Sequence, residues 1–210
     1  MISNFEGMII SILILVFSVV VHEVSHGIIA EKLGDSTARL AGRLTLNPLP
    51  HLDPFGSILL PAFLWIATAG QIILGSAKPV PVNFANLRHP KRDMVLVSLA
   101  GPGSNFLLAI VCALPLRFGL FNLSSLGGQF LLQVVIINVV LGVFNLIPIP
   151  PLDGSKVLAG VLNEKYLPWL FSLERWGFVL IIVFLYLGLL NAILLPIITF
   201  FLKYVVGLSF

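Results

Sequence analysis

Residues 7–26 read GMIISILILVFSVVVHEVSH, and this stretch decides the class of protein. Positions 7–21 carry no charged residue, which predicts the first part of a membrane-spanning helix. On such a helix His22 and His26 lie on one face and can hold one Zn²⁺, while Glu23 can act as a general base on metal-bound water. Ionisable residues inside a membrane are costly and indicate a functional site. The alternative is a histidine pair that only packs two helices together.

The composition indicates a membrane protein over the whole chain. Of its 210 residues, 58% are hydrophobic and 10% are charged, and the mean hydropathy is +1.07. A soluble domain of this size needs more polar surface than that. The runs without Asp, Glu, Lys or Arg include 57–77, 94–116, 118–152 and 176–202. The expected fold is an all-α polytopic membrane protein, with residues 1–210 forming a single intramembrane domain.

The apolar runs predict about four full spanning helices, at 7–30, 93–116, 128–147 and 176–202. The last run exceeds the roughly 20 residues that a span needs, so it should tilt, kink near Pro196 or overrun.

Two short segments are expected to be extended and associated with the membrane. Residues 77–83 contain two prolines two positions apart, which excludes a helix there. Residues 38–46 alternate enough to predict a second extended or β segment.

The distribution of Lys and Arg bears on whether 57–75 spans or re-enters. If this run crosses the membrane, the two sides hold five and seven basic residues; if it is a re-entrant hairpin, they hold ten and two. Basic residues collect on the cytoplasmic side, so the hairpin is favoured. The N-terminus is then outside, and loops 31–56, 77–93 and 148–175 are inside.

Other features limit the class of protein. The N-terminus resembles neither a signal peptide nor a transit peptide, because no Lys or Arg precedes Lys32. Cys112 is the single cysteine and lies in an apolar run, which excludes a disulfide and a Cys-ligated metal. The net charge of +3 says little about nucleic acid, because the basic residues lie in loops beside the membrane, and no nucleic-acid partner is expected. The basic cluster around His89 is most simply read as contacting anionic lipid headgroups.

Asp153 is the best candidate for a third metal ligand. It ends a 35-residue uncharged run, after a proline-rich stretch that breaks the preceding helix. Non-helical backbone at membrane depth is tolerated where it lines protein or a cavity, and it could turn a carboxylate inward. A catalytic zinc site takes three protein ligands and leaves a fourth position for water. The alternative is an ordinary N-cap aspartate at the start of a helix.

With these residues in place, the chain resembles the site-2 protease family of intramembrane zinc metalloproteases. The resemblance covers roughly residues 15–160 and favours the short prokaryotic branch of that family. The motifs that carry it, in chain order, are HEVSH at 22–26, HLDPFGS at 51–57, AKPVPVN at 77–83, AGPGSN at 100–105 and NLIPIPPLDG at 145–154.

The resemblance implies roles for individual residues. His22, His26 and Asp153 correspond to the ligands of one Zn²⁺, and Glu23 to the residue that activates the water. Asn145 matches an asparagine that positions substrate or polarises its carbonyl; the alternative is an interhelical hydrogen bond. The implied substrates are transmembrane protein helices, cleaved within the lipid bilayer. The implied location is a prokaryotic cell membrane, with the active site nearer the cytoplasmic side.

Some polar residues keep more than one interpretation. His51 and Asp53 are expected in a turn or interface, with a hydrogen bond to a ligand histidine or a weak extra metal site as alternatives. Asn105 has the same two interpretations as Asn145, and the small residues before it favour close helix packing. A zinc-binding or zinc-transport protein and an inactive scaffold remain the alternative functions.

Overall fold

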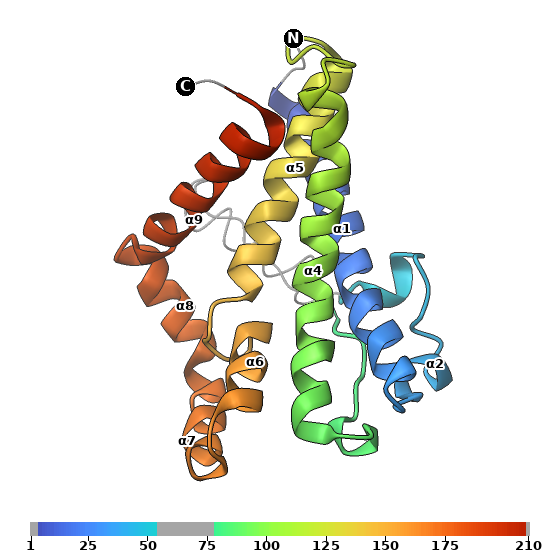
Figure 1. Ribbon diagram of the computed structural model, residues 1–210, viewed down its shortest axis with the longest axis vertical. Helices are drawn as coiled ribbons and strands as arrows, with labels where there is room; N and C mark the ends of the chain where they lie inside the picture. The colour runs from blue at the N-terminus through green and yellow to red at the C-terminus, as the bar shows by residue number, and fades with distance from the viewer. Residues whose placement is uncertain (1–3, 54–77, 209–210) are drawn as a thin grey trace.

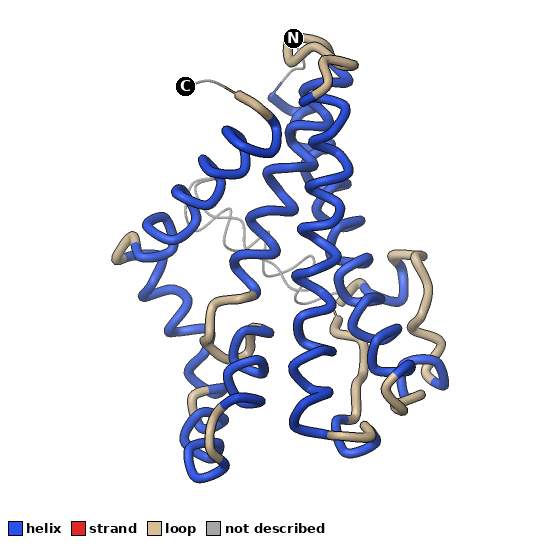
Figure 2. Tube along the Cα trace, in the orientation of Figure 1, coloured by secondary structure: helices blue, strands red, loops and turns tan. Residues whose placement is uncertain are grey.

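The computed structural model describes residues 4–53 and 78–208, and within these ranges it is helical with no strand (Figure 2). The α-helices are α1 (Asn4–Lys32), α2 (Thr37–Leu40), α4 (Pro90–Arg117), α5 (Leu126–Asn145), α6 (Asp153–Val161), α7 (Leu167–Ser172), α8 (Gly177–Tyr186) and α9 (Leu189–Phe200). Single turns of 3₁₀-helix are Leu49–His51, Phe84–Asn86, Glu164–Tyr166 and Glu174–Trp176, and a π-helix covers Phe201–Val206. The all-α prediction is confirmed.

The long helices α1, α4 and α5 form a bundle, with α4 packed against both others (Figure 1). Between α4 and α5 the core consists of small and β-branched residues, among them Ala109, Ala113, Val135 and Val139. Large apolar side chains such as Leu13 (64% exposed) point outward instead. A bundle that is apolar on its outside is suited to lipid rather than water.

Within the described part of the chain, five stretches are long and apolar enough to cross a membrane: Glu6–Lys32, Pro90–Arg117, Leu126–Asn145, Glu164–Tyr186 and Leu189–Val206. The last two follow one another along a path from the end of the bundle near α7 to the end that holds both termini (Figure 1). Together they contain the run 176–202, apart from residues 187–188 between them, for which the sequence predicts one crossing.

This run is interrupted at Gly188, a break that the sequence analysis did not predict, and the expected tilt, kink near Pro196 or overrun stays a prediction. Gly188 has φ +71°, the left-handed conformation that ends a helix and that glycine adopts without steric cost. Pro196 lies inside α9, which continues past it to Phe200. A glycine that reverses the sign of φ therefore interrupts this run more strongly than a proline does.

The expected extended segments are only partly extended. Residues 37–40 form α2, because Asp35 Oδ1 accepts hydrogen bonds from the backbone N–H of Thr37, at 3.2 Å, and from the Thr37 hydroxyl. The prediction for 38–46 is therefore wrong over 38–42, where α2 and the turn at 41–42, with Gly42 at φ +65°, replace the extended chain. Residues 78–83 are non-helical, as their two prolines require. The predicted hairpin at 57–75 lies outside the described residues.

Candidate metal centre and active site

The structure brings together His22, His26 and Asp153, although His22 and Asp153 are 131 positions apart in the sequence. Asp153 Oδ2 lies 3.0 Å from the Nε2 atom of each histidine, and the two Nε2 atoms are 3.1 Å apart. All three residues are at most 8% exposed. Among the described residues they form the one group of His, Cys, Asp or Glu side chains placed to hold a metal ion.

Helix spacing and two glycines bring the three side chains together. The histidines lie one turn apart on α1, and Asp153 begins α6 directly after the proline-rich loop. A Cβ on Gly154 would lie 2.2 Å from the carbonyl oxygen of Leu146, so this turn requires glycine. A Cβ on Gly101 would lie 2.4 and 2.5 Å from the two histidine Nε2 atoms. Gly101 therefore lets α4 approach the cluster directly.

The other nitrogen of each histidine is held by α4. His22 Nδ1 lies 2.6 Å from Asn105 Oδ1, and His26 Nδ1 lies 2.7 Å from the Val97 carbonyl oxygen. Both oxygens are acceptors, so each Nδ1 carries the proton and each Nε2 presents a lone pair. This arrangement is typical of metal-binding histidines, whose second nitrogen is fixed by a hydrogen bond.

The donor set fits a divalent metal ion on its own chemistry. Two unprotonated Nε2 atoms and a carboxylate oxygen converge to about 3 Å inside a buried site. Lone pairs that face one another at this distance repel unless a cation or a proton lies between them. Two imidazole nitrogens and one carboxylate oxygen are ligands that Zn²⁺ accepts, with a further position left open.

Asn105 belongs to a buried polar chain that the sequence did not reveal. Its Nδ2 donates to Asn138 Oδ1 at 2.9 Å, and Asn138 Nδ2 donates in turn to Ser18 Oγ at 2.9 Å. Both asparagines are 0% exposed. The small residues around Asn105 do pack closely, as expected, but Asn105 itself fixes a ligand histidine. A single amide within a run of small residues was the available signal.

Lys156 is a second residue that the sequence analysis did not assign to the site. Its Nζ lies 3.1 Å from Asp153 Oδ1, the carboxylate oxygen that faces away from the histidines. The side chain is 37% exposed, so it reaches the site from the surface. Because Lys156 engages Oδ1, Oδ2 is the oxygen left to face His22 and His26.

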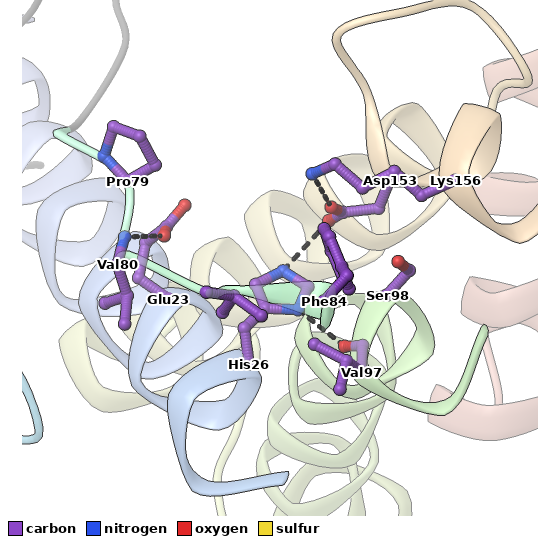
Figure 3. Close-up of a pocket in the computed structure, with 10 residues that line it drawn as sticks. Glu23, His26, Pro79, Val80, Phe84, Val97, Ser98, Asp153 and Lys156 are labelled. Carbon is purple, nitrogen blue, oxygen red and sulfur yellow. Dashed lines mark hydrogen bonds and ion pairs between the residues drawn. The ribbon is translucent and has the colours of Figure 1, made fainter. Parts of the chain in front are cut away.

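A cavity of about 140 Å³ opens beside the cluster (Figure 3). Its lining comes from α1, α4, α6, the non-helical segment 78–83 and the turn Phe84–Asn86, and consists of Glu23, His26, Pro79, Val80, Val82, Phe84, Val97, Ser98, Asp153 and Lys156. Glu23 Oε2 accepts a hydrogen bond of 2.8 Å from the backbone N–H of Val80. Figure 3 shows Glu23 and Asp153 reaching the cavity from different elements, with His26 between them. The carboxylate predicted to act as base thus shares a cavity with predicted metal ligands.

The extended segment 78–83 is anchored at both ends. Lys78 N–H donates to the His51 carbonyl at 2.9 Å, and Arg43 Nη2 donates to the Lys78 carbonyl at 2.8 Å. Asn83 N–H donates to Asp35 Oδ2 at 2.7 Å. The wall of the cavity therefore depends on contacts that lie outside it.

His51 helps to hold the segment 78–83 in place, through its carbonyl oxygen, and is not part of the metal cluster. It lies in the turn Leu49–His51, is 1% exposed, and its Nε2 is 2.9 Å from the Thr45 carbonyl. The structure therefore agrees with the expected turn role. Asp53 is the last described residue before 78, and its role stays as the sequence analysis left it.

Asp35 is the buried centre of this anchoring. Burial raises the pKa of its carboxyl, but hydrogen bonds from Thr37, Asn86 and Asn83 outweigh it, so the pKa lies below its ordinary value. The ionised form is therefore the one that the fold stabilises.

Asn145 is not part of the cluster. Its Nδ2 donates to the Leu141 carbonyl at 3.0 Å, within its own helix α5. This hydrogen bond is intrahelical, unlike the interhelical bond that was the alternative to a catalytic role. The amide has a second N–H, so its role towards substrate stays a prediction.

Comparison with known proteins supports the same kind of site. The sequence profile of Peptidase family M50 matches residues 125–187. The chain is 37% identical to "Putative zinc metalloprotease YwhC" of Bacillus subtilis (strain 168), over 88% of this chain and 84% of the relative. It is 32% identical to "Putative zinc metalloprotease Rip2" of Mycolicibacterium smegmatis, over 83% of this chain and 65% of the relative. No solved structure matches the chain significantly.

The chain therefore belongs to Peptidase family M50 and is a zinc metalloprotease. The same comparisons and the apolar helices make it an integral membrane protein that works in a lipid bilayer.

Proposed function

We propose that this chain is an intramembrane zinc metalloprotease, a single domain over residues 1–210, that hydrolyses peptide bonds within or near transmembrane helices of other proteins. The observation that carries the proposal is the position of the cluster. His26 and His22 lie six and ten residues before the end of α1 at Lys32. At 1.5 Å per residue this is roughly 9–15 Å inside an apolar helix.

His22, His26 and Asp153 hold one Zn²⁺, and Glu23 is the general base. Bound zinc supplies Lewis acidity and a water of lowered pKa. Glu23 accepts the proton of the attacking water and passes it to the leaving amine. The Val80 N–H fixes one carboxylate oxygen of Glu23 and leaves the other for this transfer.

The substrate has to lose helical structure before it is cut, because a helix buries its carbonyl oxygens in its own hydrogen bonds. The segment 78–83 is extended and lines the cavity, so an unwound substrate can lie beside it as an added strand. Pro79 and Pro81 have no N–H group and the Val80 N–H is engaged by Glu23, so the segment pairs with the substrate through the Val82 N–H and backbone carbonyl oxygens. Asn145, at the end of α5, helps to position this substrate.

The location follows from the charges. We propose that the protein lies in a prokaryotic cell membrane, with 57–75 re-entrant and the active site nearer the cytoplasmic side. The ten-to-two distribution of basic residues supports this orientation.

The test of the proposed function is a comparison of membrane proteins from cells that express either the wild-type chain or the Glu23→Gln variant. Mass spectrometry should detect transmembrane segments that are cut only in cells with the wild-type chain. The uncut forms of the same proteins should accumulate in cells with the variant. Identical patterns at equal expression would refute the proposal.

A further inference from the structure

Ser98 has an unused hydroxyl group at the wall of the active-site cavity. It lies on α4, is 1% exposed and lines the cavity together with Glu23, His26 and Asp153. Among the residues that the structure describes, its Oγ has no hydrogen-bond partner. Figure 3 shows Ser98 on the α4 side of the cavity, next to Val97. A buried hydroxyl without a partner costs free energy, so its retention requires an explanation.

The other serines within the described helices do not behave this way. Most of them donate a hydrogen bond from Oγ to the backbone carbonyl three or four residues earlier. Ser18 instead accepts a hydrogen bond from Asn138. The Oγ-to-carbonyl distance is 2.9 Å for Ser11 and 2.7 Å for Ser25, Ser104, Ser155 and Ser172. The intrahelical bond is the ordinary way to satisfy a helical serine. Ser98 does not make it.

The position of Ser98 on α4 places its hydroxyl next to the cluster of His22, His26 and Asp153. The preceding residue, Val97, holds His26 through its carbonyl, and Gly101, one turn later, faces both histidines, because a Cβ there would lie 2.4 and 2.5 Å from their Nε2 atoms. Ser98 therefore lies on the turn of α4 that abuts the metal cluster, on the side that opens to the cavity.

Peptide hydrolysis places negative charge on the oxygen of the scissile carbonyl, and donors fixed in advance towards that oxygen stabilise the transition state. Apart from His26, the side-chain donors that line the described part of the cavity are Ser98 and Lys156. Lys156 is engaged by Asp153. The hydroxyl of Ser98 is the donor without a present partner.

We infer that the Ser98 hydroxyl donates a hydrogen bond to the scissile carbonyl oxygen of the bound substrate, and holds it as negative charge develops. This inference rests on the proposed function. It makes Ser98 a further catalytic residue of the same site, and it leaves to Asn145 the positioning of the substrate chain.

The test compares Ser98→Ala with Ser104→Ala, a matched control on the same helix whose hydroxyl is tied to the Gly101 carbonyl. With a transmembrane substrate that the wild type cuts, Ser98→Ala should lower kcat by about 10- to 10²-fold and leave KM nearly unchanged. The loss is limited because bound zinc also stabilises the negative charge on the same carbonyl oxygen. Ser104→Ala should cleave like the wild type.

Two readouts do not depend on turnover. Ser98→Ala removes an unsatisfied buried group, so its unfolding temperature should stay level or rise while activity falls. A merely structural hydroxyl predicts the reverse. Binding of a dipeptidyl hydroxamate to the zinc-loaded protein should weaken by about 3- to 10-fold in Ser98→Ala and stay unchanged in Ser104→Ala.

Wild-type cleavage and hydroxamate affinity in Ser98→Ala would overturn the inference and leave the proposed function standing. A lower unfolding temperature with no loss of kcat in the folded fraction would overturn it as well. A wild-type protein that cuts no membrane protein would overturn the proposed function itself, and the hydroxamate comparison would still decide whether Ser98 contacts a ligand in the cavity.

Discussion

Replacing Asn105 with alanine should weaken zinc binding and destabilise the fold, because this side chain contacts both a ligand histidine and a buried polar chain. The substitution removes the 2.6 Å contact to His22 Nδ1 and the 2.9 Å hydrogen bond to Asn138 Oδ1. Loss of an outer partner of a ligand histidine typically lowers metal affinity by about 10- to 100-fold. Two buried polar groups also lose their partner, at about 1–3 kcal/mol each, so the free energy of unfolding should fall by ~2 kcal/mol or more.

The assay is a zinc titration in competition with a chelator, with thermal unfolding of the metal-free protein measured in parallel. Asn138→Ala is the matched control, because it disrupts the same polar chain without touching His22. It should reduce the free energy of unfolding to a similar extent and change zinc affinity by less than tenfold. An Asn105→Ala protein that folds and binds zinc within twofold of the wild type would refute the reasoning.

Three further predictions follow from the structure. Cysteine labelling from outside, in a cysteine-free background, should reach position 122 and miss positions 36 and 86, whose residues are all exposed; equal labelling at 36 and 122 would refute the orientation. The lowered pKa of Asp35 means that its stabilisation is present above the ordinary value of 3.8 and is lost as pH falls below it. Acid unfolding monitored by circular dichroism should therefore be less steep in Asp35→Asn than in the wild type, and equal steepness would contradict this. Asn145→Ala should lower kcat/KM by roughly 10²-fold with an unfolding temperature within a few degrees of the wild type, if it positions substrate. Normal cleavage by a less stable protein would show a structural role.

The sequence indicates the three residues of the cluster through two separate signals. Two histidines at a spacing of four share a helix face whatever surrounds them, and the uncharged run before them fixes the helix. Asp153 is distinctive as the first charge after 35 uncharged residues. The spacing and the family resemblance together indicate these residues, and the structure brings them within hydrogen-bonding distance.

The partners of these residues could not be predicted, because each depends on how α4 is rotated and placed against α1. The contacts of Asn105, Val97 and Ser98 with the site are tertiary, and nothing in their spacing singles them out. The break at Gly188 has a related cause. Whether a glycine in an apolar run adopts a positive φ depends on where the chain must turn, which a single sequence does not state.

Substitution of Glu23 by glutamine, measured for cleavage and zinc content in one preparation, tests the central claim most directly. Glutamine keeps the shape of the side chain but cannot accept the proton of the water, so cleavage of a transmembrane substrate should slow by at least about 10²-fold. His22, His26 and Asp153 remain, so zinc should stay near one per chain, whereas a His22→Ala, His26→Ala double variant should lose it. Full cleavage by the Glu23→Gln protein at equal expression, or zinc retained by the double variant, would contradict the account.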